Sequence, residues 1–264
     1  MAIELKNVSF AYPNGHLANQ DLNLTINDGE CVAIIGQNGA GKTTAVKLMN
    51  ALYKPTKGDV FVNGINTKSK TTAKIAKYVG YVFQNPDEQI FNKDIITELE
   101  YMPRYLKLDE SEIRRRVDKA IELTQIEEYV NSNPYDIPYP IRKFVTIASV
   151  IATEPNYIIL DEPTAGQDER GMQILKNIIA KLESEGTSVI TITHDMEFVA
   201  NNFTRVIAMA NKQIIADDTP KNIFWNESVV KESRIKKPQM GEVAKQLNLP
   251  GKILHINELV DAIK

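Results

Sequence analysis

The stretch GQNGAGKTT, residues 36–44, decides how the rest of the chain is interpreted. It satisfies the pattern G-x-x-x-x-G-K-[ST], and it lies between an apolar run typical of a β-strand and a segment with helical periodicity. Glycines let the backbone approach phosphate groups closely, and the N–H groups of a helix N-terminus attract anions. A chance glycine-rich turn is the alternative, but the flanking strand and helix favour a phosphate site. The expected binding residues are Gly36, Asn38, Gly39, Ala40, Gly41, Lys42, Thr43 and Thr44.

Two side chains of this loop suit a magnesium nucleotide. Lys42 offers a mobile positive charge to the β- and γ-phosphates, and the hydroxyl of Thr43 is expected to bind Mg²⁺. The apolar run YIILD, residues 157–161, ends in Asp161, whose carboxylate would complete the Mg²⁺ shell. The expected cofactors are therefore ATP and Mg²⁺.

Two further residues are candidates for the chemical step. Glu162 directly follows Asp161 and is expected to polarise the attacking water as a general base, although a surface carboxylate at a strand end is the alternative. His194 ends an apolar run and should emerge at the same sheet edge, where we expect it to contact the γ-phosphate. His16 and His255 have no comparable setting, and we interpret both as structural.

The apolar patterns around these motifs predict an α/β fold. Alternation of apolar and polar residues predicts antiparallel strands over residues 3–12 and 16–28. Further strands are expected over residues 31–36, 58–64, 79–84, 157–162 and 188–194. Helices are expected over residues 43–53, from about 94 to 123, over 144–153 and 170–186, and in a small tail after Trp225. Strand, helix and strand in succession imply a parallel sheet with helical crossovers.

Composition limits the class of protein. A length of 264 residues allows one large domain, or a domain with an appendage. A net charge of −3 gives no reason to expect a nucleic-acid partner, since such domains usually carry a strong basic excess. Cys31, the single cysteine, lies in an apolar run and is expected to be a buried, inert thiol. No secretory signal is visible, and no apolar run reaches the roughly 20 residues that span a bilayer, so a membrane connection would need a partner.

In order and context, GQNGAGKTT, VFQNP (residues 82–86), YIILDEPTAGQD (157–168) and THD (193–195) resemble the ATP-binding subunits of ABC transporters. The resemblance implies ATP hydrolysis to ADP and phosphate. It also implies a P-loop NTPase fold of the ABC type: a RecA-like parallel core, an N-terminal antiparallel β layer and an inserted helical subdomain. The expected boundaries are an ATPase domain over 1–225, its helical subdomain at about 88–145, and a helical extension over 226–264 that supports dimerisation.

The same resemblance implies roles for three more residues. Gln84 corresponds to the glutamine that binds near Mg²⁺ and couples the nucleotide site to the membrane subunit. Asp168 corresponds to an aspartate at the dimer interface, and Tyr12 to the aromatic residue that stacks on adenine. An aromatic residue that only packs is the alternative for Tyr12.

A finer resemblance is to the energising ATPases of energy-coupling factor (ECF) importers, which take up vitamins and transition-metal ions. The segments QNPDEQIF (residues 84–91) and LPGKILHINELVDAIK (249–264) carry it. It implies a peripheral position on the cytoplasmic face of the membrane. The implied partners are a second ATPase, a transmembrane coupling subunit and a substrate-binding membrane protein, with no nucleic acid.

One segment departs from the family pattern. Where the resemblance expects a signature close to L-S-G-G-Q, this chain has IPYPI, residues 137–141, and residues 134–148 contain no serine or glycine in any register. Pro138 and Pro140 lack N–H groups, and Tyr139 adds a side chain where close backbone approach is needed. When present, each charge-assisted hydrogen bond from the signature contributes roughly 1.5 to 3 kcal/mol to holding the γ-phosphate bound by the other subunit, and this contribution is lost here.

A homodimer would therefore have two defective sites, although the residues that bind the nucleotide directly are all present. We predict a heterodimer with a second ABC ATPase that contributes an intact signature. A drifted but tolerated loop is the simpler alternative. A non-transport regulatory ABC ATPase and a largely structural nucleotide-binding subunit are the alternative functions.

Overall fold

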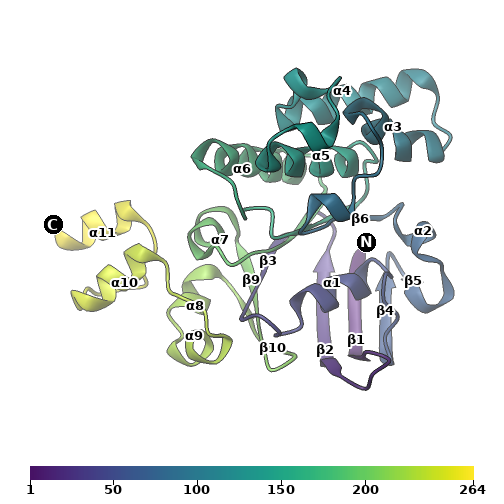
Figure 1. Cartoon of the computed structure of the whole chain (residues 1–264). Coiled ribbons are helices and arrows are strands. Elements are labelled where there is room, and N and C mark those ends of the chain that lie inside the picture. Colours follow the sequence, from purple (N-terminus) through teal and green to yellow (C-terminus); the bar gives the residue numbers. More distant parts are fainter.

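The computed structural model describes residues 1–264 and contains two β-sheets (Figure 1). The smaller sheet is antiparallel, with the order β2 (Leu17–Asn27), β1 (Ala2–Ala11), β4 (Lys57–Val62) and β5 (Ile65–Asn66). The larger sheet has the order β10 (Gln213–Asp218), β9 (Arg205–Ala210), β3 (Cys31–Ile35), β8 (Ser188–Ile192), β7 (Tyr157–Asp161) and β6 (Val79–Val82). All pairs of the larger sheet are parallel except β9 with β10, which confirms the predicted parallel core. The smaller sheet confirms the predicted antiparallel N-terminal layer.

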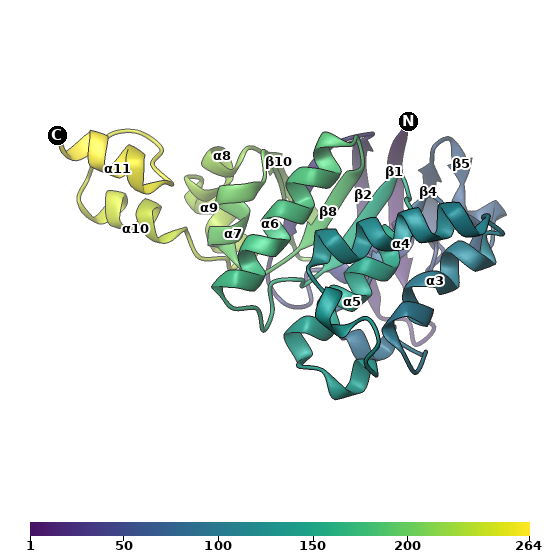
Figure 2. The same cartoon turned by 90° about the horizontal axis from the view of Figure 1, so that it is seen from above.

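Helices cover the larger sheet and form the C-terminal end. They are α1 (Lys42–Met49), α2 (Thr72–Ile75), α3 (Ile95–Tyr105), α4 (Glu110–Thr124), α5 (Tyr139–Ile151), α6 (Glu169–Ser184), α7 (Met196–Asn202), α8 (Pro220–Phe224), α9 (Glu227–Ser233), α10 (Gln239–Gln246) and α11 (Ile256–Ile263). Figure 2 shows α3 and α4 at one end of the molecule and α10 and α11 at the other. No helix combines the length and apolar character needed to cross a membrane.

The central strands are apolar along their whole length because both of their faces are covered. In β3, Val32 and Ile34 belong to a core shared with β1, β2 and α1, whereas Ala33 and Ile35 belong to the core beneath the helices. Cys31 is buried with the second group, as predicted, and burial raises the pKa of its thiol to about 11. With alternate residues facing opposite layers, β3 is fixed at the centre of the molecule.

Three predicted helices differ from the structure, one of them being the helix expected over residues 144–153, which begins at Tyr139 and ends at Ile151. The helix expected over residues 43–53 already ends at Met49, because Ala51 adopts a left-handed φ of 63° and the Asn50 side chain accepts a hydrogen bond from the Leu52 N–H. The charged pattern from 94 to 123 forms two helices, since Lys107 takes a φ of 60° and Asp109 caps a new helix. Turn chemistry, which the periodicity does not report, ends the helix expected over residues 43–53 early and divides the 94–123 segment into α3 and α4.

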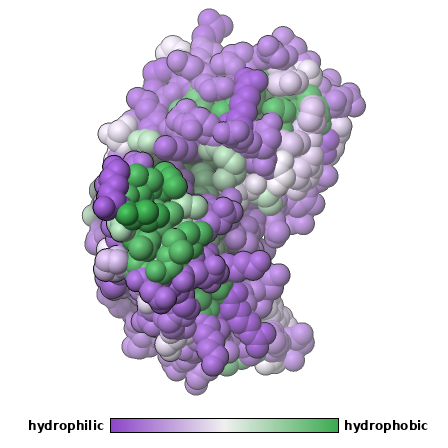
Figure 3. All heavy atoms as spheres, turned by 90° about the vertical axis from the view of Figure 1, so that its left-hand side faces the viewer, coloured by the Kyte–Doolittle hydropathy of each residue, from purple (hydrophilic) through white to green (hydrophobic).

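The C-terminal helices leave apolar side chains uncovered. α9 contributes Val229 to the main core, whereas α10 and α11 enclose a separate small cluster around Ala244 and Leu259. Five exposed side chains of α10, its C-cap and α11 form what we call the C-terminal apolar patch: Val243, Leu247, Ile256, Val260 and Ile263. Figure 3 faces this end of the molecule and shows apolar residues gathered on it.

Candidate nucleotide site

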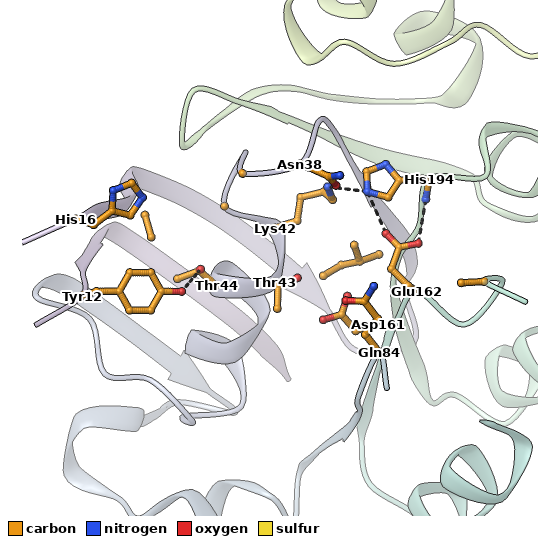
Figure 4. A pocket seen from close by; sticks show the side chains of 15 residues that line it. Tyr12, His16, Asn38, Lys42, Thr43, Thr44, Gln84, Asp161, Glu162 and His194 are labelled. Atoms are coloured by element: carbon orange, nitrogen blue, oxygen red, sulfur yellow. Dashed lines mark hydrogen bonds and ion pairs between the residues drawn. The ribbon is translucent and has the colours of Figure 1, made fainter. Parts of the chain in front are cut away.

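A cavity of about 550 Å³ lies at the carboxyl ends of β3, β7 and β8 (Figure 4). The parallel sheet brings the loops after these strands to one edge, although the loop after β3 is more than a hundred residues from the loops after β7 and β8 in sequence. Most of the predicted site residues line the cavity: Tyr12, Asn38, Gly39, Gly41, Lys42, Thr43, Thr44, Gln84, Asp161, Glu162 and His194. Gly36, Ala40 and Asp168 do not line it.

The glycine-rich loop owes its shape to close backbone contacts. Gly36 has a φ of 144°, and a Cβ there would lie 2.1 Å from the carbonyl oxygen of Met209. Gly41 has a φ of 98°, and a Cβ there would meet the Asn19 side chain at 2.4 Å. Gly36 therefore packs the loop against the β9 backbone, and Gly41 leads directly into α1, whose first-turn N–H groups are free to bind an anion.

Lys42 is buried beside the loop. Its ammonium donates hydrogen bonds to the carbonyl oxygens of Gly36, at 2.7 Å, and Gln37, at 3.1 Å. Burial lowers the pKa of Lys42, while the carboxylates of Glu162 and Asp161 oppose that shift. The positive charge thus lies beside both acidic residues, where a bound phosphate would also meet it.

Asp161 has one satisfied and one unsatisfied carboxylate oxygen. The hydroxyl of Tyr81, on β6, donates to Oδ2 of Asp161 at 2.6 Å in a buried position, and burial raises the pKa of that hydroxyl. The other oxygen, Oδ1, is buried without a hydrogen-bond partner. An orphaned carboxylate oxygen, with the Thr43 hydroxyl and the Gln84 side chain lining the same cavity, fits a hard cation that prefers oxygen ligands.

Glu162 contacts His194 at one end of the cavity. Nε2 of His194 lies 3.2 Å from Oε1 of Glu162, and the backbone N–H of His194 donates to Oε2 at 3.2 Å (Figure 4). Nε2 also lies 3.5 Å from the Lys42 ammonium. Burial, followed by the nearby Lys42 charge, lowers the pKa of His194, so the neutral ring is favoured.

Burial is the main influence on the pKa of Glu162, the candidate general base. It raises the pKa of Glu162 to about 6, although the His194 N–H and the Lys42 charge act in the opposite direction. A carboxylate with this pKa is still ionised at neutral pH and can accept a proton more readily than an ordinary glutamate. Glu162 is thus suited to polarise a water molecule.

The sequence interpretation missed three residues near the site. Tyr81 and Lys143 contact Asp161 and Glu162 respectively, and Lys143 is buried with its ammonium donating to the carbonyl oxygen of Glu162 at 2.8 Å. His16, which we interpreted as structural, lines the cavity with its ring centre 6.3 Å from that of Tyr12 at an interplanar angle of 19°. The Y-x-x-x-H spacing across a turn was the available signal for His16.

Tyr12 lies at the outer end of the cavity. Its hydroxyl forms a hydrogen bond with the Thr44 hydroxyl at 3.0 Å, and its ring also contacts Phe10 edge to face. The ring therefore packs and lines the cavity at once. Stacking on adenine remains a prediction for this residue.

Asp168 and the IPYPI segment, residues 137–141, lie outside the cavity. Asp168 is the N-cap of α6, where its carboxylate accepts a hydrogen bond from the Gly171 N–H at 2.8 Å. Pro138 is the N-cap of α5, without a side-chain hydrogen bond, and Pro140 occupies its first turn. Their roles at a subunit interface remain predictions.

Comparison with known proteins places this site in context. Residues 19–165 match the sequence profile of the family described as ABC transporter. An energy-coupling factor transporter ATP-binding protein of Caldanaerobacter subterraneus is 39% identical over 272 residues, covering 99% of this chain and 98% of that protein. The energy-coupling factor transporter ATP-binding protein EcfA2 of Clostridium perfringens is 35% identical over 277 residues, covering 100% of this chain and 97% of that protein.

Solved structures are similar as well. CbiO1 of Clostridium perfringens, described as part of the ABC transporter complex CbiONQ, has a TM-score of 0.78 at 29% identity and covers 94% of this chain and 98% of that chain. A dimeric ATP-binding cassette in a post-hydrolysis state, bound to ADP and Pi, has a TM-score of 0.75 at 26% identity, covering 83% of this chain and 98% of that chain.

Proposed function

Because this chain belongs to the family of ABC transporter ATP-binding proteins, we propose that it is the hydrolysing member of an asymmetric ATPase pair that drives an ECF-type importer. The chain is an ATP-binding ATPase subunit of this family. The observation that supports asymmetry is the contrast between its complete nucleotide cavity and the donor-poor first turn of α5.

In the nucleotide cavity, each group has a defined task. Lys42 binds the β- and γ-phosphates, and Thr43, Gln84 and Asp161 hold Mg²⁺, which neutralises phosphate charge. Glu162 accepts a proton from the attacking water, and His194 holds the γ-phosphate in line. The 3.2 Å contact between His194 and Glu162 supports this division, since it keeps both groups at the end of the cavity where the γ-phosphate would lie.

The first turn of α5 supports the second half of the proposal. A helix normally offers free N–H groups at its N-cap and first three residues, which here are Pro138, Tyr139, Pro140 and Ile141. The two prolines remove half of these donors, and the next N–H, of Arg142, already donates to the Pro138 carbonyl at 3.0 Å. Such a turn is a poor clamp for a γ-phosphate.

The proposed pair contains two unequal composite sites, each formed by the phosphate loop of one ATPase and the signature segment of the other. One pairs the cavity of this chain with the signature of the partner ATPase and hydrolyses ATP. The other pairs the partner's phosphate loop with residues 137–141 and binds ATP without efficient turnover. The transmembrane coupling subunit and the substrate-binding membrane protein complete the importer at the cytoplasmic face of the membrane, and its cargo is a vitamin or a transition-metal ion.

The test is gentle detergent purification of the tagged chain from its native cells, with mass spectrometry of what is recovered. We expect a second ABC ATPase with an intact signature, together with membrane proteins. The E162Q complex should then lose turnover by about 100-fold or more while still binding ATP. Replacement of the corresponding glutamate in the partner ATPase is the matched control and should lower turnover far less.

Two outcomes would support the alternatives. Recovery of this chain alone and away from membranes would favour a non-transport regulatory ATPase. Unchanged turnover in the E162Q complex would favour a largely structural nucleotide-binding subunit. Hydrolysis at a transporter-like rate by homodimers of the pure chain would contradict the asymmetric pair.

A further inference from the structure

Lys143, in the second turn of α5, is a buried cation outside the nucleotide cavity. The residue is 3% exposed, and the only protein atom that accepts a hydrogen bond from its ammonium is the carbonyl oxygen of Glu162, at 2.8 Å. Its ammonium also lies 5.7 Å from the centre of the Tyr139 ring. Lys143 thus joins the helix that carries the departing segment to the residue after the magnesium-binding aspartate.

Glu162 is held at every polar group it has. Its N–H donates to the Ile192 carbonyl at 2.8 Å, its carboxylate accepts from the His194 N–H, and its carbonyl accepts from Lys143. Its φ of 52° is left-handed, which a residue with a side chain adopts only when the surroundings impose it. The Lys143 contact is one of four hydrogen bonds that fix this conformation, since the Ala165 N–H also donates to the Glu162 carbonyl, at 3.4 Å.

Further contacts bind the start of α5 to the segment after Glu162. The Gln167 side-chain amide donates to the Pro140 carbonyl oxygen at 3.1 Å. A side chain at Gly166 would meet the ring of Tyr139 at 3.8 Å, so this ring packs close to the backbone at Gly166. The first turns of α5 and residues 162–167 are therefore connected at both ends of that segment.

A purely structural account does not explain a lysine at this position. Burying an ammonium with a single acceptor costs more than burying a methionine of similar length, and burial lowers the pKa of Lys143 while the carboxylates of Glu162 and Asp161 oppose that shift. What the lysine adds is a strong donor aimed at one carbonyl group. That carbonyl belongs to the residue whose side chain faces the γ-phosphate end of the cavity.

We propose that Lys143 is a positioning residue for ATP hydrolysis, which holds the Glu162 main chain and so ties the glutamate to the helix that faces the partner's nucleotide. The inference rests on the proposed function, in which Glu162 polarises water and residues 137–141 lie at the subunit interface. ATP bound beside α5 in one composite site then affects the geometry of Glu162 in the other.

The experiment compares K143M, K143Q and K143R in the assembled transporter, with kcat, KM for ATP, nucleotide affinity and Tm measured for each. K143M and K143Q should lower kcat about tenfold or more, because a small displacement of a catalytic group is costly, and should leave KM within about twofold. K143R, which keeps a charged donor, should retain most of kcat. K54M is the matched control, since Lys54 also donates to backbone carbonyls, those of Thr67 and Lys70, but does not line the cavity, and it should behave as wild type.

A double-mutant cycle with E162Q separates positioning from general damage. If Lys143 acts through Glu162, K143Q should change the residual turnover of the E162Q complex by less than about twofold. A further large loss in that background would overturn the proposal, as would K143Q or K143M complexes with the kcat of K54M. So would an equal loss of kcat in K143R and K143Q.

The two proposals fail in different ways. An E162Q complex with normal turnover would overturn both of them, because Glu162 would then have no catalytic role to be positioned for. An inactive E162Q complex beside a fully active K143M complex would overturn only the role of Lys143.

Discussion

At the residue scale, Glu162 combines three features that oppose stability. Its side chain is 11% exposed, its backbone is left-handed, and it lies beside the carboxylate of Asp161. Functional sites commonly retain such local strain because the chemistry requires it. The residue is therefore expected to affect folding and turnover in opposite directions.

The first prediction concerns the stability of the isolated chain. The pKa of Glu162 is raised from its ordinary value to about 6, so the ionised carboxylate destabilises the folded state above pH 6 and this cost disappears as the pH falls below about 4.5. E162Q should therefore be more stable than wild type by about 2 kcal/mol at pH 7.5 and equally stable near pH 4. Urea unfolding at the two pH values measures this. E128Q, at an exposed position, should change neither value.

The second prediction concerns the Tyr81 hydroxyl, which holds one oxygen of Asp161. Y81F keeps the ring but frees the carboxylate to turn away from Thr43, so the Mg²⁺ concentration for half-maximal turnover should rise about tenfold. Mn²⁺ binding followed by electron paramagnetic resonance provides a readout independent of turnover. Y78F is the control, and equal metal affinity in Y81F and Y78F would contradict the expected role.

At the scale of elements, α5 connects three parts of the molecule. Its Arg142 guanidinium donates to the Asp87 carboxylate at 2.7 Å and to the Tyr135 carbonyl at 3.0 Å. Asp87 lies three residues after Gln84, so the loop before α5 is anchored to the segment that follows the cavity glutamine. The departing sequence IPYPI therefore forms an ordered turn with few donors.

The third prediction is that donors can be restored to this turn. In the E162Q complex, the substitutions P138S, Y139G and P140G supply a hydroxyl and two N–H groups, each hydrogen bond contributing roughly 1.5 to 3 kcal/mol to binding the γ-phosphate. Turnover should rise about tenfold above the E162Q level, now at the other composite site. The same triple variant with the partner's catalytic glutamate also replaced should stay at the E162Q level. No gain in the first complex would indicate that the turn does not limit hydrolysis.

At the scale of the whole molecule, the nucleotide cavity and the C-terminal apolar patch lie at separate places. The nucleotide cavity lies at the carboxyl edge of the larger sheet, whereas the C-terminal apolar patch lies at the far end of the C-terminal helices (Figures 1 and 3). Five exposed apolar side chains on two short helices are unfavourable in water unless another surface covers them. A second ATPase subunit is the occupant that the predicted dimerisation of residues 226–264 requires.

The fourth prediction tests this patch. V260K and I263K together should weaken the pairing of the two ATPases by about tenfold or more, because they place charges in an apolar contact, and should leave the Tm of the isolated chain unchanged. Native mass spectrometry of the purified pair measures the association. N257K adds a charge to the same helix outside the patch and serves as the control. Undiminished pairing of the double variant would exclude the patch as the contact.

Much of the fold could be predicted because the signals are local. Continuous apolar runs marked β3, β7 and β8, and alternation marked β1 and β2. The hairpin of β9 and β10 was not assigned, although β9 contains the buried apolar run VIAMA, residues 206–210. Its partner β10 is an edge strand with partly exposed residues, which leaves a weaker pattern. The end of α1 was misplaced because the left-handed turn at Ala51 has no glycine to announce it.

The sequence by itself determined the phosphate loop, the acidic pair after an apolar strand and the histidine after another, because glycine geometry and strand periodicity act within a few residues. Only the tertiary structure decided that Tyr81 holds Asp161, that Lys143 holds Glu162 and that His16 reaches the cavity. These contacts join residues on different strands and helices, and they exist only once the sheet order and helix packing have brought distant segments within hydrogen-bond distance.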